Sequence, residues 1–235
     1  MPAIADPGDE NAILEPPYHA LVKDLLARDS SLPYVHVSST SVLPGSDRGA
    51  SRAAAEESGD ARRAPLEFDE TTPVGPENSR GERRLRLERR IRELYPRAGI
   101  LRSTGIYGPG RSIASQFQRG DFRRTNSGNV YVSRIHVHDL ARLFLAMAAC
   151  LRKNSDDPMA RLVHAVDERP TANEEVFSFL ERELSVDVPG DWRGGGPRGR
   201  IIRSLYARDL LGDRYRYPTY VEGFRACLAG EAAGL

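Results

Sequence analysis

Short apolar segments alternate along this chain with longer segments of helical periodicity, and this alternation constrains the fold more than any other feature of the sequence. Strands are predicted at residues 34–38, 99–102, 130–135 and 162–166. Helices of ten or more residues between successive strands act as crossovers, and crossovers join parallel strands. The pattern therefore predicts an α/β protein built on a mostly parallel sheet with flanking helices.

Helices are predicted where apolar residues recur at intervals of three and four, at residues 15–28, 79–95, 139–151, 171–184, 205–211 and 221–228. Ser79 and Glu82 have the spacing of a capping box, in which each side chain bonds the backbone N–H of the other residue. Thr171 and Glu174 have the same spacing, and Asp139 is the expected N-cap of the helix that follows it.

The chain is expected to divide into a core, residues 1–170, and a small C-terminal helical lobe, residues 171–235. Within the core, residues 43–64 are rich in Gly, Ser, Ala, Arg and Glu and show no periodicity. Such a segment buries too little apolar surface to offset the entropic cost of ordering it, so this insertion is predicted to be disordered and dispensable. Residues 189–199, rich in Gly and Pro, are predicted to form a linker within the lobe.

Charge and cysteine content narrow the partners and the compartment. The net charge is +1, and acidic residues are interspersed among the arginines, which argues against nucleic acid as a partner. No apolar run approaches the ~20 residues that span a bilayer, so no membrane partner is expected. Cys150 and Cys227 predict reduced thiols in the cytoplasm or another reducing compartment. Residues 1–10 fit neither a secretory signal nor a transit peptide, but organelle targeting stays open if Met1 is not the natural start.

Two sequence features could indicate ligand sites, but the evidence for each is weak. His136 and His138 would point the same way on a strand, but a zinc site needs further ligands and no third with suitable spacing is present. The glycines at 194–196 do not follow a predicted strand, so they do not predict a phosphate-binding loop. The sequence therefore predicts no metal site.

Four segments in a fixed order carry a resemblance to a known family: residues 37–42 (VSSTSV), 101–110 (LRSTGIYGPG), 133–141 (SRIHVHDLA) and 215–223 (YRYPTYVEG). Together they resemble the extended short-chain dehydrogenase/reductases, the NAD-dependent epimerase/dehydratase group, and above all its atypical YeeZ-like branch. The resemblance runs from about residue 12 to residue 228 apart from the insertion. It implies a partial Rossmann-type parallel sheet and, in the complete protein, NAD or NADP as cofactor and a small metabolite as partner.

Members of that family transfer protons with a Ser or Thr, a Tyr and a Lys. The resemblance places Ser39 at the hydroxyl position, with Thr40 as the neighbouring candidate, although such residues also end strands by bonding local backbone. It places Arg80 at the Tyr position and Arg84 at the Lys position, four residues apart and so on one helix face. Arginine stays protonated at physiological pH and cannot shuttle a proton. The alternative is a solvated helix face, because residues 80–92 contain seven Arg and two Glu.

The resemblance also implies contacts to cofactor and substrate. Ser103, Thr104 and Ile106 correspond to the segment that passes the nicotinamide, and Arg111 to a residue that faces substrate. Small residues allow the backbone to approach a ligand closely, although the glycines of residues 105–110 could serve turn geometry alone.

No glycine-rich dinucleotide fingerprint occurs before Ser39. Since that turn holds the cofactor pyrophosphate, residues 1–235 alone are expected to bind neither NAD nor NADP usefully. The chain resembles the later part of its relatives, with on the order of 60 to 90 residues of the first half absent. The predicted function is NAD(P) binding without Tyr–Lys catalysis, whether or not the protein is an enzyme. The alternatives are a non-catalytic cofactor-sensing or interaction protein, or an inactive truncated gene product.

Overall fold

The computed structural model describes residues 19–45, 65–120, 122, 129–153, 157, 161–189, 198–212 and 214–232 of the 235-residue chain. The described helices are α1 (His19–Arg28), α3 (Ser79–Leu94), α4 (Ile113–Gln118), α5 (Val137–Lys153), α7 (Asn173–Leu184), α8 (Ala207–Leu210) and α9 (Tyr220–Ala232). The described strands are β1 (Val35–Ser39), β2 (Leu66–Phe68), β3 (Gly99–Ser103), β4 (Gly105–Tyr107), β5 (Val130–Val132), β6 (Arg134–His136), β7 (Leu162–Ala165), β8 (Thr171–Ala172) and β9 (Arg198–Ile202). A short 3-10 helix, η1 (Thr40–Val42), follows β1.

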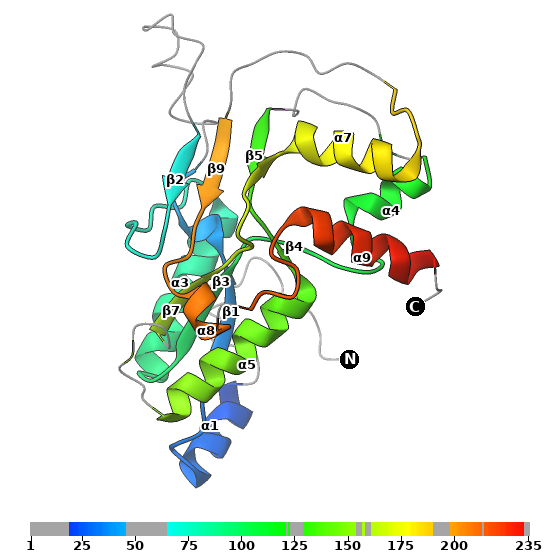
Figure 1. Cartoon of the computed structure of the whole chain (residues 1–235). Coiled ribbons are helices and arrows are strands. Elements are labelled where there is room, and N and C mark those ends of the chain that lie inside the picture. The colour runs from blue at the N-terminus through cyan, green and yellow to red at the C-terminus, as the bar shows by residue number, and fades with distance from the viewer. Residues whose placement is uncertain are drawn as a thin grey trace, which may run out of the picture.

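A parallel sheet in the strand order β1-β3-β7 lies at the centre of the molecule (Figure 1). Ser39 at the end of β1 lies opposite Ser103 of β3. Ser103 in turn lies opposite Ala165 of β7. The carboxyl ends of the three strands therefore meet at one edge of the sheet. Strands and crossover helices alternate as the sequence predicts, which confirms the α/β fold class with a partial Rossmann-type sheet.

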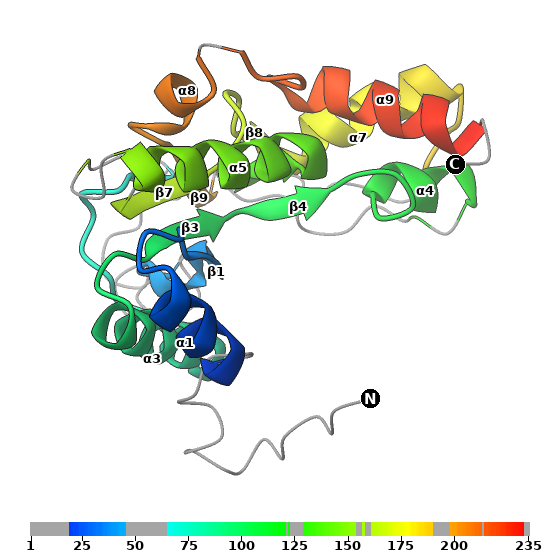
Figure 2. The same cartoon turned by 90° about the horizontal axis from the view of Figure 1, so that it is seen from below.

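Helices cover both faces of this sheet (Figure 2). α5 and α8 pack on one face, and α1 and α3 pack on the other. All five residues of the central strand β3 are buried, as expected for a strand between two helical layers. Leu101 joins the apolar cluster under α5, and its neighbour Ile100 joins the cluster under α3. Alternate side chains of one strand thus contribute to two cores.

Two smaller sheets complete the described strands. One has the order β2-β9-β5-β8, and the other pairs β4 with β6 in parallel. The prediction of a single strand over residues 130–135 is wrong, because β5 ends before Ser133 and β6 begins after it. The Ser133 hydroxyl accepts the Ile202 N–H at 2.8 Å, which ties this break to β9. β9 itself begins at Arg198, inside the segment predicted to be a linker.

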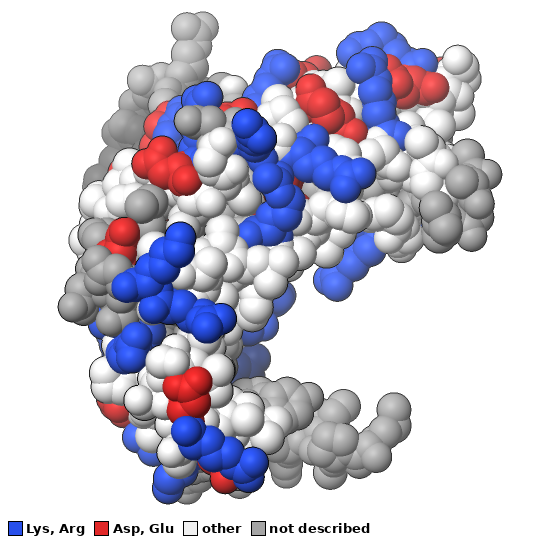
Figure 3. Space-filling view, turned by 60° about the horizontal axis from the view of Figure 1, so that its bottom comes forward, with Lys and Arg blue, Asp and Glu red and all other residues white. Residues whose placement is uncertain are grey.

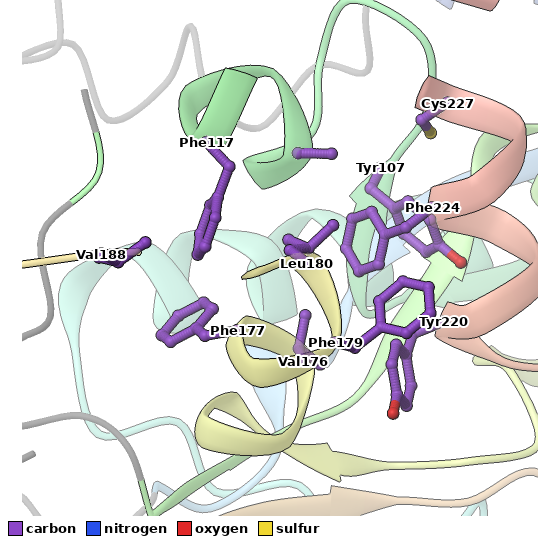
Figure 4. Close-up of a cluster of buried hydrophobic side chains, with 11 residues drawn as sticks. Tyr107, Phe117, Val176, Phe177, Phe179, Leu180, Val188, Tyr220, Phe224 and Cys227 are labelled. Carbon is purple, nitrogen blue, oxygen red and sulfur yellow. The ribbon is translucent and has the colours of Figure 1, made fainter. Parts of the chain in front are cut away.

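An aromatic cluster forms the second core (Figure 4). Its side chains come from β4, α4, α7 and α9, and include Tyr107, Phe117, Val176, Phe177, Phe179, Leu180, Tyr220 and Phe224. α4 precedes residue 170, whereas α8, which follows it, packs into the cluster under α5. Each core therefore draws on both sides of residue 170, and the division of the chain at that point stays a prediction.

The helix starts differ from the predicted caps. Asn78 is the N-cap of α3 and accepts the Gly81 N–H at 2.9 Å, so Ser79 is already helical and forms no capping box. Thr171 lies in β8, and α7 follows Ala172 without a side-chain cap. Both predicted boxes are wrong because a neighbouring residue, or the pairing of β8 with β5, determines where the helix begins.

Asp139 is not the N-cap of α5, which begins at Val137. The Asp139 side chain is fully buried in the first turn and accepts the backbone N–H groups of Arg216 at 2.9 Å and Tyr217 at 2.8 Å. It therefore anchors the segment that leads to α9 instead of ending a helix.

Part of the predicted insertion belongs to the core. Leu43 is 1% exposed and packs against Phe68 and Ile202. The prediction of disorder over residues 43–64 is therefore wrong at its start, because Leu43 covers the apolar side of β2 and β9. Residues 46–64 lie outside the described residues. Two other predictions also fall outside them, at residues 15–18 and 194–196.

Candidate functional site

β1 ends in hydroxyl side chains at the carboxyl edge of the central sheet. The Ser39 Oγ accepts the Ser41 N–H at 3.2 Å and so caps η1. Thr40 is buried, and its carbonyl oxygen accepts a bond from the Arg200 guanidinium at 3.0 Å. Ser39 is half-buried, and its hydroxyl bonds local backbone.

The end of β3 carries the two predicted cofactor contacts that have hydroxyl groups. The Ser103 hydroxyl donates to the Ser38 carbonyl at 2.9 Å, and the Thr104 hydroxyl donates to the Ala165 carbonyl at 2.9 Å. These bonds link β3 to the strands on either side of it. The hydroxyls retain lone pairs but have committed their protons to the backbone.

α3 approaches this edge through Gly81. A Cβ at this position would lie 2.3 Å from the Ser41 carbonyl oxygen, so only glycine permits such close packing of α3 on η1. Arg80 is exposed and Arg84 is half-buried on the flanks of this contact. Neither has a hydrogen-bond or ion-pair partner within the part of the chain that the structure describes.

The charge of Arg84 also acts on His36 of β1. Burial lowers the pKa of His36, and the Arg84 charge lowers it further against the opposing effect of Glu88. His36 is therefore neutral at pH 7, and its buried Nε2 has no partner among the described residues. A positively charged helix face thus meets a neutral edge of the sheet.

A buried ion pair holds α3 onto β3. Arg102 Nη2 lies 2.8 Å from Glu88 Oε2, and Arg102 Nε lies 3.1 and 3.2 Å from the two carboxylate oxygens. The side chains are 4% and 3% exposed, respectively. This bidentate pair fixes the helix that carries Arg80 and Arg84 relative to the sheet. The sequence indicated neither partner.

A cavity of about 450 Å³ lies beside β4, β6 and α4. It brings together two predicted residues, Ile106 and Arg111. The other lining residues are Gly105, Tyr107, Gly110, Ser112, Ile113, Ser115, Gln116, Arg119, Val132, Arg134 and Phe224. Of the remaining predicted residues, Ser39, Thr40, Arg80, Arg84, Ser103 and Thr104 do not line it. The structure therefore separates the predicted site into a sheet edge and a cavity.

Glycines on and around the wall of this cavity are required for structural reasons. A Cβ at Gly108 would lie 2.6 Å from a Val137 methyl group, and Gly110 has a φ of +71°, in the left-handed region. A Cβ at Gly223 of α9 would lie 1.9 Å from the Tyr107 hydroxyl. Close packing and turn geometry account for these three glycines.

Three buried polar residues at the cavity come from β4, β6 and the loop after β7, and the sequence assigns a role in the site to none of them. Tyr107 Oη and Asp167 Oδ2 have no hydrogen-bond partner within the described residues. Burial raises the pKa of Asp167 to about 8 and, with the Asp167 charge, raises the pKa of Tyr107. Arg134, the third residue, is 9% exposed and lines the cavity.

The two histidines stack with ring centroids 5.3 Å apart, but His136 is buried and its Nδ1 accepts the His138 N–H at 3.2 Å. Burial lowers the pKa of His136 to about 4. The described residues contain no group of three or more His, Cys, Asp or Glu side chains arranged to hold a metal ion. Among the described helices, none is both long and apolar enough to cross a membrane.

Comparison of the sequence with family models and with curated proteins gives no match. Solved structures do share the fold. A functionally unknown conserved protein from Silicibacter pomeroyi is 23% identical, with a TM-score of 0.67 over 93% of this chain and 74% of that chain. A proposed NAD-dependent epimerase/dehydratase from Methylobacillus flagellatus is 24% identical, with a TM-score of 0.63 over 94% of this chain and 73% of that one.

UDP-glucuronic acid 4-epimerase from Bacillus cereus, solved in complex with NAD, has the same fold at lower identity. It is 16% identical, with a TM-score of 0.60 over 83% of this chain and 59% of that chain. These likenesses show that the chain has the Rossmann-type fold found in NAD-dependent epimerase/dehydratase structures.

Proposed function

We propose that this chain is a divergent member of the NAD-dependent epimerase/dehydratase family. In this proposal it forms the nicotinamide-facing and substrate-facing side of an NAD(P) site for a small metabolite. The observation that carries the proposal is the approach of α3 to the carboxyl edge of the sheet at Gly81, with Arg80 and Arg84 on either side. NAD in the Bacillus cereus epimerase structure of the same fold supports the choice of cofactor.

The chemistry proposed for Arg80 and Arg84 is anion binding. Their guanidinium groups stay charged at physiological pH, so they cannot take the proton-transfer roles of Tyr and Lys. Both belong to the first two turns of α3, where the helix dipole favours negative charge. Two forked cations can hold a phosphate or a carboxylate through charge-assisted hydrogen bonds. We therefore propose no turnover of alcohols or epimerisable sugars through this pair.

Ile106 gives the most direct test of the cofactor side. It is 37% exposed and lines the cavity, and the family resemblance places it at the nicotinamide. In saturation-transfer NMR, the nicotinamide protons of nicotinamide mononucleotide should receive more saturation from the protein than the adenine protons of AMP, which has the same phosphate but the other base. Ile106→Ala should weaken mononucleotide binding about fivefold, the effect of ~1 kcal/mol of apolar contact.

Leu145→Ala is the matched control, since Leu145 is a 67% exposed apolar residue on α5. This change should leave both signals unaltered. Equal saturation of AMP and nicotinamide mononucleotide, or equal effects of the two substitutions, would contradict the cofactor assignment.

A non-catalytic, cofactor-sensing or interaction protein is the second candidate. The observation that favours it is the charge at positions 80 and 84, which binds anions without transferring protons. Figure 3 shows basic side chains gathered along the face seen there, with fewer acidic ones among them. The two candidates share the binding step and differ in whether any substrate is converted.

A further inference from the structure

Arg134 is an unusual residue to find in the interior, because it is a buried cation without a counter-ion. The residue is 9% exposed at the start of β6 and borders the 450 Å³ cavity. Taking a charge out of water costs several kcal/mol unless an opposite charge compensates for it. The groups that contact Arg134 therefore decide whether its charge is compensated.

The hydrogen bonds of Arg134 go to neutral acceptors. Nη1 donates to the carbonyl oxygens of Val132 at 2.9 Å and Thr171 at 3.4 Å, and Nη2 donates to the Asn173 Oδ1 at 2.7 Å. Within the described residues no carboxylate forms an ion pair with this guanidinium. These bonds orient the side chain but leave its charge uncompensated.

The nearest acidic influence on Arg134 does not supply that charge either. Burial lowers the pKa of Arg134 against the opposing effect of Asp167. Burial raises the pKa of Asp167, which favours the neutral form of that carboxyl group, and no ion pair joins it to Arg134 among the described residues. Glu175, on the same side, is already paired with Arg169. Arg134 is therefore a buried cation on the wall of the cavity whose described partners are all neutral.

Among the described residues, the rest of the cavity wall adds positive charge and no negative charge. The described lining contains Arg111 and Arg119 as well as Arg134, and neither Asp nor Glu is among these described residues. Arg111 is exposed, and its side chain has no hydrogen-bond or ion-pair partner within the described residues. Ser112 and Gln116 supply neutral hydrogen-bond donors. Apolar side chains, among them Ile113, Val132 and Phe224, form the remaining wall.

We propose that this cavity binds the anionic end of a small metabolite, a phosphate or a carboxylate, with Arg134 as its buried counter-ion and Arg111 at its mouth. A planar guanidinium matches both anions through paired, charge-assisted hydrogen bonds. The volume falls in the range of small-molecule sites, and the apolar wall suits an uncharged remainder of the ligand. This inference rests on the proposed function only in that the metabolite would lie beside Ile106.

Phenyl phosphate and benzoate test the two anions, and benzamide is the uncharged control of the same shape. Isothermal titration should show binding of at least one of the two anions and none of benzamide. Arg134→Gln should weaken that binding about tenfold or more, the effect of losing a charge-assisted hydrogen bond. Since Arg134 is buried, Arg111→Ala provides a second variant that should fold normally and weaken binding severalfold.

Two control variants separate this site from the sheet edge. Arg86→Ala removes an exposed, unpaired arginine from the outer face of α3 and should not change the affinity. Arg80→Ala with Arg84→Ala removes the anion-binding pair proposed at the sheet edge, so the phenyl phosphate or benzoate binding that this double variant retains belongs to another site. Added to this double variant, Arg134→Gln should weaken the remaining binding about tenfold or more. Loss of all binding in the Arg80 and Arg84 double variant would overturn the cavity assignment while the proposed function stands. Equal affinity for benzamide, or unchanged affinity in both cavity variants, would also overturn it.

Discussion

Replacing Arg102 with alanine should lower the free energy of unfolding by about 3–5 kcal/mol, because it leaves Glu88 as an uncompensated buried charge. The two side chains are 4% and 3% exposed and share three nitrogen–oxygen contacts between 2.8 and 3.2 Å. The pair joins α3 to the central strand β3. Its loss should therefore also loosen the packing of the apolar cluster under α3. Urea denaturation followed by far-UV circular dichroism measures the change.

A paired substitution provides the control. Arg102→Met combined with Glu88→Leu removes both charges and keeps apolar volume, so this double variant should recover most of the lost stability. A loss of less than about 1 kcal/mol on Arg102→Ala, the size expected for a surface ion pair, would show that the pair is not buried as described.

The second large effect concerns the pH dependence of stability. Burial raises the pKa of Asp167 from the usual 3.8 to about 8. Below the unfolded pKa both states are protonated and the group has no effect on stability. As the pH rises from the unfolded value to the folded one, the unfolded chain releases the proton first, so stability falls by up to about 1.4 kcal/mol per pH unit. Over this window the loss reaches about 6 kcal/mol as an upper bound.

Asp167→Asn removes this titration. The wild-type protein should therefore lose stability relative to the variant as the pH rises from about 4 to about 8, and urea denaturation at several pH values measures the difference. Asp187→Asn, at an exposed acid, is the control and should show no such trend. Parallel pH profiles for the wild type and the Asp167 variant would contradict the burial of this carboxyl group.

The sequence predicts the central sheet well because each of its strands can be recognised from a short stretch of neighbouring residues. The apolar runs that became β1, β3 and β7 are flanked by long periodic helices, and crossover connections leave parallel pairing as the expected arrangement. The sequence places the N-cap of α3 one residue too late, because Asn78 and Ser79 are equally good caps in sequence. The sequence does not reveal the break at Ser133, because the bond that stabilises it comes from Ile202, far along the chain.

The residues of the candidate site also fall into those that the sequence can predict and those that it cannot. Arg80 and Arg84 share a helix face by spacing alone, so their placement followed from the sequence. Arg134 and Asp167 come from separate elements, and only their joint burial makes them notable. Burial of that kind depends on how β6, the loop after β7 and α7 pack together, which no local pattern encodes.

Arg80 and Arg84 are proposed to bind an anion at the edge of the sheet. The test is isothermal titration of inorganic pyrophosphate into three proteins: the wild type, Arg80→Ala with Arg84→Ala, and the charge-matched Arg86→Ala with Arg89→Ala, which changes two exposed arginines on the other side of α3. We expect about a tenfold or greater loss of affinity for the first double variant and little change for the second. Equal affinities for the two double variants would show that Arg80 and Arg84 are only part of a solvated helix face.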